Sequence, residues 1–270
     1  MNLERELEVA IRLAREAGRV IMEYYSAPPD VEWKADTEPV TIADRAANEL
    51  IVTGLSKAFP EDGLLAEETP DTSARLSHDR LWVIDPMDGT KEFIKKNGEF
   101  SVMIGLALDG TASLGVVYQP TVDRLFYATP DAGAFLVRSG ETPERLAVSE
   151  VTETSEMCVA VSRSHRSEKI DAVREALGIA REVQSGSVGL KVGLICERTC
   201  DLYIHPSPQT KQWDTCAPEA LLVGAGGRMT DLTGRPFVYN RQDLYNRNGI
   251  LATNGKSHER ILERVTQAFS

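Results

Sequence analysis

The chain has 270 residues, of which 42% are hydrophobic, and its formal net charge is −11. This length and composition allow one large domain or two closely packed halves with a sizeable core. The negative charge argues against a nucleic acid polymer or an anionic membrane surface as partner. A small phosphorylated substrate is compatible with it, because cations bound by clustered carboxylates reverse the local field.

The cysteines and the first residues indicate a reducing compartment. Cys158, Cys196, Cys200 and Cys216 lack the paired spacing of a zinc site, so we expect buried free thiols. The first eight residues are acidic and polar, unlike a signal peptide, and no apolar run approaches the length of a membrane span. These features together predict a cytoplasmic protein without a membrane span.

The first half of the sequence predicts helices packed on a largely antiparallel sheet. Two stretches carry apolar residues at helical spacing, and residues 31–41 between them are expected to be extended or loop. Asp109-Gly110 separates two apolar runs and is a strong hairpin signal. The predicted elements are helix 3–21, helix 43–58, strands 64–66 and 81–84, helix 91–96, and strands 101–108, 112–119, 124–129 and 133–137.

From about Leu146 the pattern changes to alternating strands and helices, which favours an α/β arrangement. We therefore divide the chain into an α+β half (1–145) and an α/β half (146–270) that form one continuous catalytic unit. The predicted elements of the second half are strand 157–162, helix 168–177, helix 188–197, strand 201–205, helix 214–224, strands 228–231 and 250–253, and helix 257–269.

The hexapeptide Asp-Pro-Met-Asp-Gly-Thr (85–90) is the most informative segment. It places Asp85 and Asp88 at the end of an apolar strand and next to a helix start. Carboxylates in such a place can hold a hard divalent cation, and the first N–H groups of a helix can hold a phosphate oxygen. The segment therefore favours metal-assisted phosphate chemistry, although Asp-Pro and Asp-Gly also occur as simple turns and helix caps.

Further acidic residues stand at other junctions between elements. Glu67-Glu68 ends a short strand, while Asp44 and Asp214 open helices. Each has a structural alternative: Thr41-x-x-Asp44 is a capping box, the glutamates can be solvated, and Asp214 can serve the helix dipole. Their conjunction favours an active site, because each lies where a layered α/β fold places its catalytic carboxylates.

In order and spacing, these motifs resemble the signature of the lithium-sensitive, magnesium-dependent phosphatases of the inositol monophosphatase superfamily. The motifs are Glu67-Glu68, the hexapeptide, and Trp213-Asp214 followed by Gly226-Gly227. Within the superfamily, GTKEFIKKNGEF (89–100), SRSH (162–165) and KQWDTCAPEALL (211–222) are most similar to the 3′(2′),5′-bisphosphate nucleotidases. The resemblance implies a layered αβαβα sandwich and inhibition by lithium.

The resemblance also implies a set of cation ligands and a catalytic pair. Asp44 and Thr90 would orient and deprotonate the attacking water, while two or three Mg²⁺ ions lower its pKa and neutralise charge. The implied ligands are Glu67, Asp85 and the carbonyl of Met87 for one ion, Asp85, Asp88 and Asp214 for a second, and Glu67 with Glu68 for a weaker third.

The substrate contacts that the resemblance implies lie mostly in the second half. They are Gly89, Thr90, Ser162, His165, Lys191 and Lys211. His165 can equally be a surface or packed residue, and Lys191 can belong to the solvated face of its helix. Some relatives carry Ser where this chain has Val188, with Ser187 adjacent, so the implied phosphate contacts differ here.

The implied reaction is removal of the 3′-phosphate of 3′-phosphoadenosine 5′-phosphate to give AMP, by metal-activated water. An inositol monophosphatase-like enzyme with the same chemistry and a different pocket is the first alternative. A non-catalytic metal- or nucleotide-binding module is the second, although all the implied ligands are present. The sequence leaves open the exact substrate, the number of ions bound at rest, and whether the protein is a monomer or a homodimer.

Overall fold

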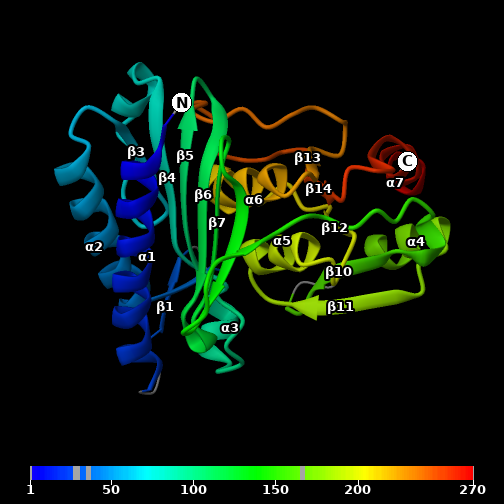
Figure 1. Cartoon of the computed structure of the whole chain (residues 1–270), viewed down its shortest axis with the longest axis horizontal. Helices are drawn as coiled ribbons and strands as arrows, with labels where there is room; N and C mark the ends of the chain where they lie inside the picture. Colours follow the sequence, from blue (N-terminus) through cyan, green and yellow to red (C-terminus); the bar gives the residue numbers. More distant parts are fainter. Residues whose placement is uncertain (1, 27–30, 35–37, 165–167, 270) are drawn as a thin grey trace.

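Alternating layers of helix and sheet make up the fold, in the order αβαβα (Figure 1). The computed structural model describes residues 2–26, 31–34, 38–164 and 168–269. The layered sandwich predicted from the sequence is confirmed. The helical layers, in order across the molecule, are α1 (Glu4–Tyr25) with α2 (Ile42–Ala58), α5 (Val188–Cys196) with α6 (Gln212–Gly224), and α4 (Glu168–Leu177) with α7 (His258–Phe269).

The first sheet has seven strands in sequential order. Its strands are β3 (Gly63–Ala66), β4 (Arg80–Asp88), β5 (Ser101–Leu108), β6 (Thr111–Gln119), β7 (Arg124–Thr129), β8 (Gly133–Arg138) and β9 (Glu144–Arg145). All neighbours are antiparallel except β3 and β4, which are parallel. The predicted hairpin is confirmed: Asp109 and Gly110 join β5 to β6 with φ of 49° and 77°, the left-handed values that such tight turns require.

The second sheet has five strands in the order β11-β10-β12-β14-β13. They are β10 (Cys158–Ser162), β11 (Arg181–Ser185), β12 (Leu202–His205), β13 (Arg228–Thr230) and β14 (Ile250–Thr253). The first three are mutually parallel, which fits the α/β pattern, and the last two are antiparallel. The edge strand β11 is not among the predicted elements, because its sequence Arg-Glu-Val-Gln-Ser has no apolar run.

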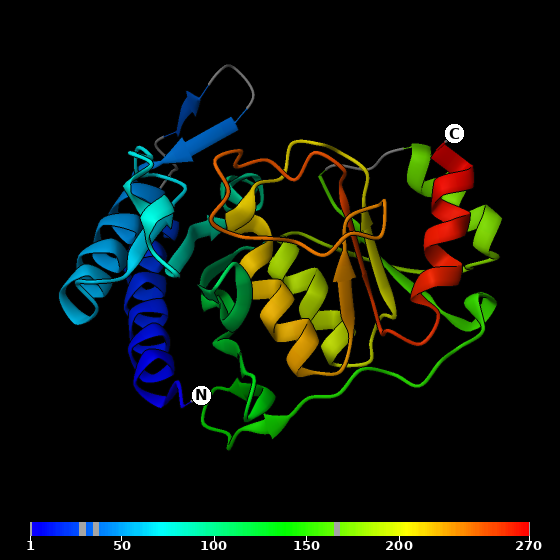
Figure 2. The ribbon, with the colours of Figure 1, turned by 90° about the horizontal axis from the view of Figure 1, so that it is seen from above.

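Several local boundaries differ from the predictions. The stretch predicted as extended or loop contains a small hairpin of β1 (Val31–Lys34) and β2 (Glu38–Thr41), which projects from the layered body (Figure 2). Helix α3 (Thr90–Ile94) is shorter than predicted, since Lys96 adopts φ of 58°. Helix α6 begins two residues before the predicted start.

Two glycines allow α6 to lie directly on the first sheet. A Cβ on Gly115 of β6 would come within 2.2 Å of the carbonyl oxygen of Ala217, and one on Gly105 of β5 within 2.6 Å of Cys216 Sγ. No real side chain tolerates such distances, so both positions require glycine for this close approach. The approach fixes α6, and with it Asp214 near the start of that helix, against the sheet that carries Asp85.

The four cysteines are buried thiols, as predicted, with the sulfurs of Cys158 and Cys200 3.7 Å apart. Among the residues that the structure describes, no helix combines the length and the apolar character needed to span a bilayer. The cytoplasmic location and the division of the chain at 145/146 stay predictions.

A buried histidine makes the stability of the second sheet sensitive to acid. His258, only 2% exposed, opens α7 and has its ring nitrogens 2.9 Å from the hydroxyls of Thr230 and Thr253. Burial, with a smaller effect of Arg228 opposed by Glu259, lowers its pKa from 6.5 to about 4. The unfolded chain therefore binds more protons between these pH values, so this contribution is complete above pH 6.5 and is lost as pH falls toward 4.

We expect the free energy of unfolding to lose about 2 kcal/mol through His258 between pH 7 and pH 5. In the variant His258→Gln this part of the pH dependence should disappear, because the amide does not titrate. Urea unfolding at both pH values measures it, with His78→Gln as the control substitution. An equally steep decline in His258→Gln would show that other groups cause the acid sensitivity.

Candidate active site

Segments from several elements meet where β3 and β4 end. Glu67 and Glu68 follow β3, and the hexapeptide 85–90 runs from the end of β4 into α3. The first turns of α2 and α6 bring Asp44 and Asp214 to the same region. Helix N-termini carry a partial positive charge, so their convergence favours a collection of carboxylates there.

Three carboxylates form a compact cluster at this point. One oxygen from each of Asp85, Asp88 and Asp214 lies within 4.8 Å of the others, a spacing that a single cation can bridge. Burial, followed by the charges of Glu67, Asp88 and Asp214, raises the pKa of Asp85 well above its usual value. A divalent cation would remove this repulsion, and an all-oxygen donor set suits a hard ion. The residues therefore fit a metal ion.

The other predicted ligands lie around this cluster. Glu67 lines the same cavity, and its charge acts on Asp85, so it is not merely a solvated loop residue. Glu68 is not among the cavity-lining residues, and its charge acts on Asp44. The backbone N–H of Met87 donates to Asp85 Oδ1 at 3.0 Å, which fixes the turn of the hexapeptide.

The capping box predicted at the start of α2 is present and includes the predicted catalytic pair. Asp44 Oδ2 accepts hydrogen bonds from the backbone N–H and the hydroxyl of Thr41, at 2.7 and 2.6 Å. Its other oxygen, Oδ1, accepts from the hydroxyl of Thr90 at 3.0 Å. Burial raises the pKa of Asp44 to about 6, against the lowering effect of the bonds from Thr41. Capping and contact with Thr90 are thus both fulfilled by one carboxylate.

Ser187, which the sequence predictions do not include as a site residue, holds one oxygen of Asp88. Its hydroxyl donates to Asp88 Oδ2 at 2.6 Å, and the N–H of Gly189 donates to the same oxygen at 3.2 Å. Ser187 is also the N-cap of α5 and lies 2.8 Å from the hydroxyl of Ser101. A serine directly before an apolar helix is the sequence signal that identifies it as a cap.

Lys191 is a buried cation. The alternative that it belongs to the solvated face of its helix is therefore wrong. Only 3% of the residue is exposed, and its ammonium donates to the carbonyl of Gly186 and lies 5.1 Å from the centre of the Tyr203 ring. Burial lowers its pKa to about 8, while the charges of Asp88 and Glu92 act in the opposite direction. A cation in this position can offset part of the negative charge of the cluster and contact an anionic ligand.

Glu67, Asp85, Asp88 and Asp214 line a cavity of about 650 Å³. Gly89, Thr90, Ser162 and Lys191, all predicted to contact substrate, are among the lining residues. The rest of the wall mixes apolar residues with polar ones such as Lys91, Lys169 and His205. The sequence does not reveal the apolar part, because such residues look like ordinary core positions. These apolar residues are Val161, Ile170, Val188, Ile204, Pro206 and Pro208.

Two further predicted substrate contacts remain, Lys211 and His165. The ammonium of Lys211 lies over the rings of Trp213 and Tyr245, 5.1 and 5.6 Å from their centres, and Lys211 is not a lining residue. His165 lies outside the described residues. The roles of both stay predictions.

Known proteins resemble the chain over nearly its whole length. The profile of the Inositol monophosphatase family matches residues 2–269. The 3′(2′),5′-bisphosphate nucleotidase CysQ of Salmonella typhimurium is 36% identical over 252 residues, which cover 92% of this chain and 99% of the relative.

Solved structures give the same result. CysQ from Bacteroides thetaiotaomicron, described as a bacterial member of the inositol monophosphatase family, superposes with a TM-score of 0.80 at 32% identity, covering 94% of this chain and 99% of that one. The IMPase of Thermotoga maritima gives 0.82 at 27% identity, covering 98% of both chains. The chain therefore belongs to the inositol monophosphatase family.

Proposed function

We propose that the protein is a magnesium-dependent phosphatase that removes the 3′-phosphate of 3′-phosphoadenosine 5′-phosphate, giving AMP and phosphate. The observation that carries this proposal is one cavity lined both by the cluster of carboxylates and by a set of apolar side chains. The name of the Salmonella typhimurium relative supports it, since that protein is a 3′(2′),5′-bisphosphate nucleotidase.

The carboxylates would hold the cations. We assign Glu67, Asp85 and the carbonyl of Met87 to one magnesium ion, and Asp85, Asp88 and Asp214 to a second, with Glu68 near a weaker third. The chemistry supplied by bound magnesium is activation of the attacking water and neutralisation of charge on the phosphoryl oxygens.

Asp44 and Thr90 would manage the proton of the attacking water. The Thr90 hydroxyl donates to Asp44 Oδ1, so its oxygen lone pairs are directed away from that carboxylate. A water that donates to Thr90 Oγ1 can pass its proton to that oxygen as the hydroxyl proton moves to Asp44. Because Thr41 fixes Asp44 Oδ2, the acceptor oxygen keeps its position throughout.

The remainder of the cavity would bind the nucleoside and the second phosphate. Lys191 provides a buried positive charge, and Ser162 a hydroxyl, at the cavity surface. Side chains such as Ile170 and Ile204 offer an apolar wall that suits the face of a purine. A polyhydroxylated inositol ring would leave that wall without an apolar partner, which favours the nucleotide over the inositol phosphate alternative.

We expect kcat/KM for 3′-phosphoadenosine 5′-phosphate to exceed that for inositol 1-phosphate by on the order of a hundredfold, the range that burial of an apolar group supplies. Free-phosphate detection with Mg²⁺ measures both rates, and EDTA should abolish them. Preference for inositol 1-phosphate would refute the nucleotide assignment. Absence of turnover with any phosphomonoester would favour the non-catalytic alternative.

Replacement of Asp85, the residue assigned to both magnesium ions, should increase the stability of the metal-free protein and decrease its activity. In Asp85→Asn the loss of one buried negative charge should raise the melting temperature in EDTA, because Asp85 repels its neighbours in the metal-free protein. The same variant should lose several orders of magnitude in kcat and no longer be stabilised by Mg²⁺. Asp109→Asn, at the exposed hairpin turn, is the matched control and should behave as wild type. Retained turnover in Asp85→Asn would contradict the shared-ligand assignment.

The Thr90 hydroxyl should be essential and its methyl group should not. We expect Thr90→Val to lose about 10²- to 10⁴-fold in kcat, the usual contribution of a positioned proton-transfer group. Thr90→Ser should keep most of the activity, because it retains the donor to Asp44. Steady-state kinetics at saturating Mg²⁺ distinguish the two variants. Similar activities in both would remove Thr90 from the proton path.

A further inference from the structure

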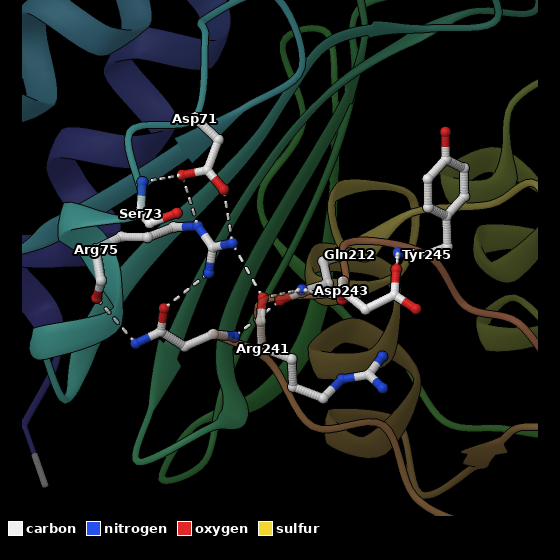
Figure 3. Close-up of polar contacts among 8 residues, drawn as sticks. Asp71, Ser73, Arg75, Gln212, Arg241, Asp243 and Tyr245 are labelled. Atoms are coloured by element: carbon white, nitrogen blue, oxygen red, sulfur yellow. Dashed lines mark hydrogen bonds and ion pairs between the residues drawn. The ribbon is translucent and has the colours of Figure 1, made fainter.

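A buried arginine outside the cavity joins two distant segments of the chain. Arg75 lies in the short 3₁₀ helix Ala74–Ser77 and is only 3% exposed. Its guanidinium forms a two-pronged contact with Asp71, with Nε and Nη2 at 3.1 and 2.8 Å from the carboxylate oxygens. Figure 3 shows the same group reaching the backbone of Arg241, where Nη2 donates to the carbonyl at 3.0 Å. The guanidinium is thus held between residues more than 160 positions apart.

Asn240 strengthens this connection from the other side. Its side-chain oxygen accepts from Arg75 Nη1 at 3.0 Å, and its amide donates to the carbonyls of Arg75 and His78 at 3.0 and 2.8 Å. Asn240 adopts φ of 64°, a left-handed conformation that asparagine tolerates and glycine prefers. The contact is therefore built from both side chains and the backbone of Arg75.

Gln212 carries the connection into helix α6. Its side-chain oxygen accepts from the N–H of Asn240 at 2.8 Å, and its amide donates to the carbonyls of Arg241 and Asp243, each at 3.1 Å (Figure 3). Gln212 is 1% exposed and is the first residue of α6, two positions before Asp214. An unbroken series of hydrogen bonds thus runs from Asp71 to the first turn of the helix that carries Asp214.

Each of the two joined segments is continuous with a proposed cation ligand. Residues 67–77 connect Glu67 and Glu68 to Arg75, and α6 supplies Asp214. Asp85 and Asp88, by contrast, are fixed by β4 and its pairing with β5. Glu67 is anchored to β4 by its N–H bond to the carbonyl of Ile84, at 3.1 Å, and α6 is held by its packing on Gly105 and Gly115. The contact through Arg75 adds a direct link between the two segments, and such supporting contacts hold ligand spacing more tightly.

We propose that Asp71, Arg75, Asn240 and Gln212 form a clamp that positions Glu67 and Asp214 for cation binding. These are positioning residues: none is among the residues that line the cavity, and they act through the ligands. The inference rests on the proposed cation site. It assigns a function to a hydrogen-bonded network around a buried arginine that the reaction itself does not use.

The clamp differs from an ordinary surface ion pair in its burial. Arg247 and Asp243 lie in the loop that carries Asn240 and form an ion pair with the same four-residue spacing as Arg75 and Asp71. Their side chains are much more exposed, at 59% and 47%. The Arg75 side chain is 1% exposed and its donors are shared among Asp71, Asn240 and Arg241. Exposed pairs contribute little, whereas a buried fork with several acceptors fixes geometry. Arg247 therefore provides a matched comparison.

The test compares Arg75→Lys and Asn240→Gly with Arg247→Lys as control. Lysine keeps the charge of Arg75 but loses the planar fork, and glycine suits the left-handed backbone of Asn240 while removing its side-chain bonds. Isothermal titration calorimetry measures Mg²⁺ binding, and kinetics give kcat, KM and the Mg²⁺ concentration for half-maximal activity. We expect about 10- to 100-fold weaker Mg²⁺ binding in the two clamp variants, with kcat partly restored at high Mg²⁺ and KM little changed.

The outcomes separate the clamp from the proposed function. Unchanged Mg²⁺ affinity in Asn240→Gly, with only a lower melting temperature, would overturn the inference and leave the cation site intact. The same decision can be made from Asn240→Gly alone if Arg75→Lys fails to fold. Wild-type protein that binds no Mg²⁺ would overturn both the cation site and the clamp. An equal loss of affinity in Arg247→Lys would show that any change in the loop has this effect and would also refute the clamp.

Discussion

Mutual repulsion among partly buried carboxylates is the constraint on which the rest of the structure depends. Asp85, Asp88 and Asp214 have oxygens within 4.8 Å of one another, and Glu67 adds its charge to Asp85. Like charges this close in a partly desolvated place destabilise a fold unless opposite charge is near. The surrounding residues partly offset this repulsion, and a bound divalent cation would offset the rest.

Helix dipoles, hydrogen bonds and the buried ammonium group of Lys191 offset part of this repulsion. The first turns of α2 and α6 present their positive ends to the acids. Ser187 and the start of α5 bind one oxygen of Asp88, while Lys191 lies close enough to lower the pKa of that carboxyl in opposition to burial. The close packing of α6 on Gly105 and Gly115 then holds Asp214 against the strand that carries Asp85.

Much of this arrangement could be predicted from local sequence patterns, whereas contacts between distant segments could not. The Asp109-Gly110 turn and the capping box at Asp44 depend on neighbouring residues, so their patterns are visible in the sequence. The burial of Lys191 depends on β12 and on a cavity that no local pattern describes. The contact between Arg75 and Asn240 spans 165 positions, and a lone arginine in a polar loop gives no sign of it.

The acidic and the apolar residues that line the cavity come from different parts of the fold. The proposed cation ligands belong mainly to the first sheet and α6, whereas Val161, Ile170 and Ile204 belong to β10, α4 and β12. Residues that recognise the organic part of a substrate can therefore change without disturbing those that perform the hydrolysis. Such modularity allows a lineage to acquire new specificities through a few exchanges in one wall, and it offers an engineer the same route.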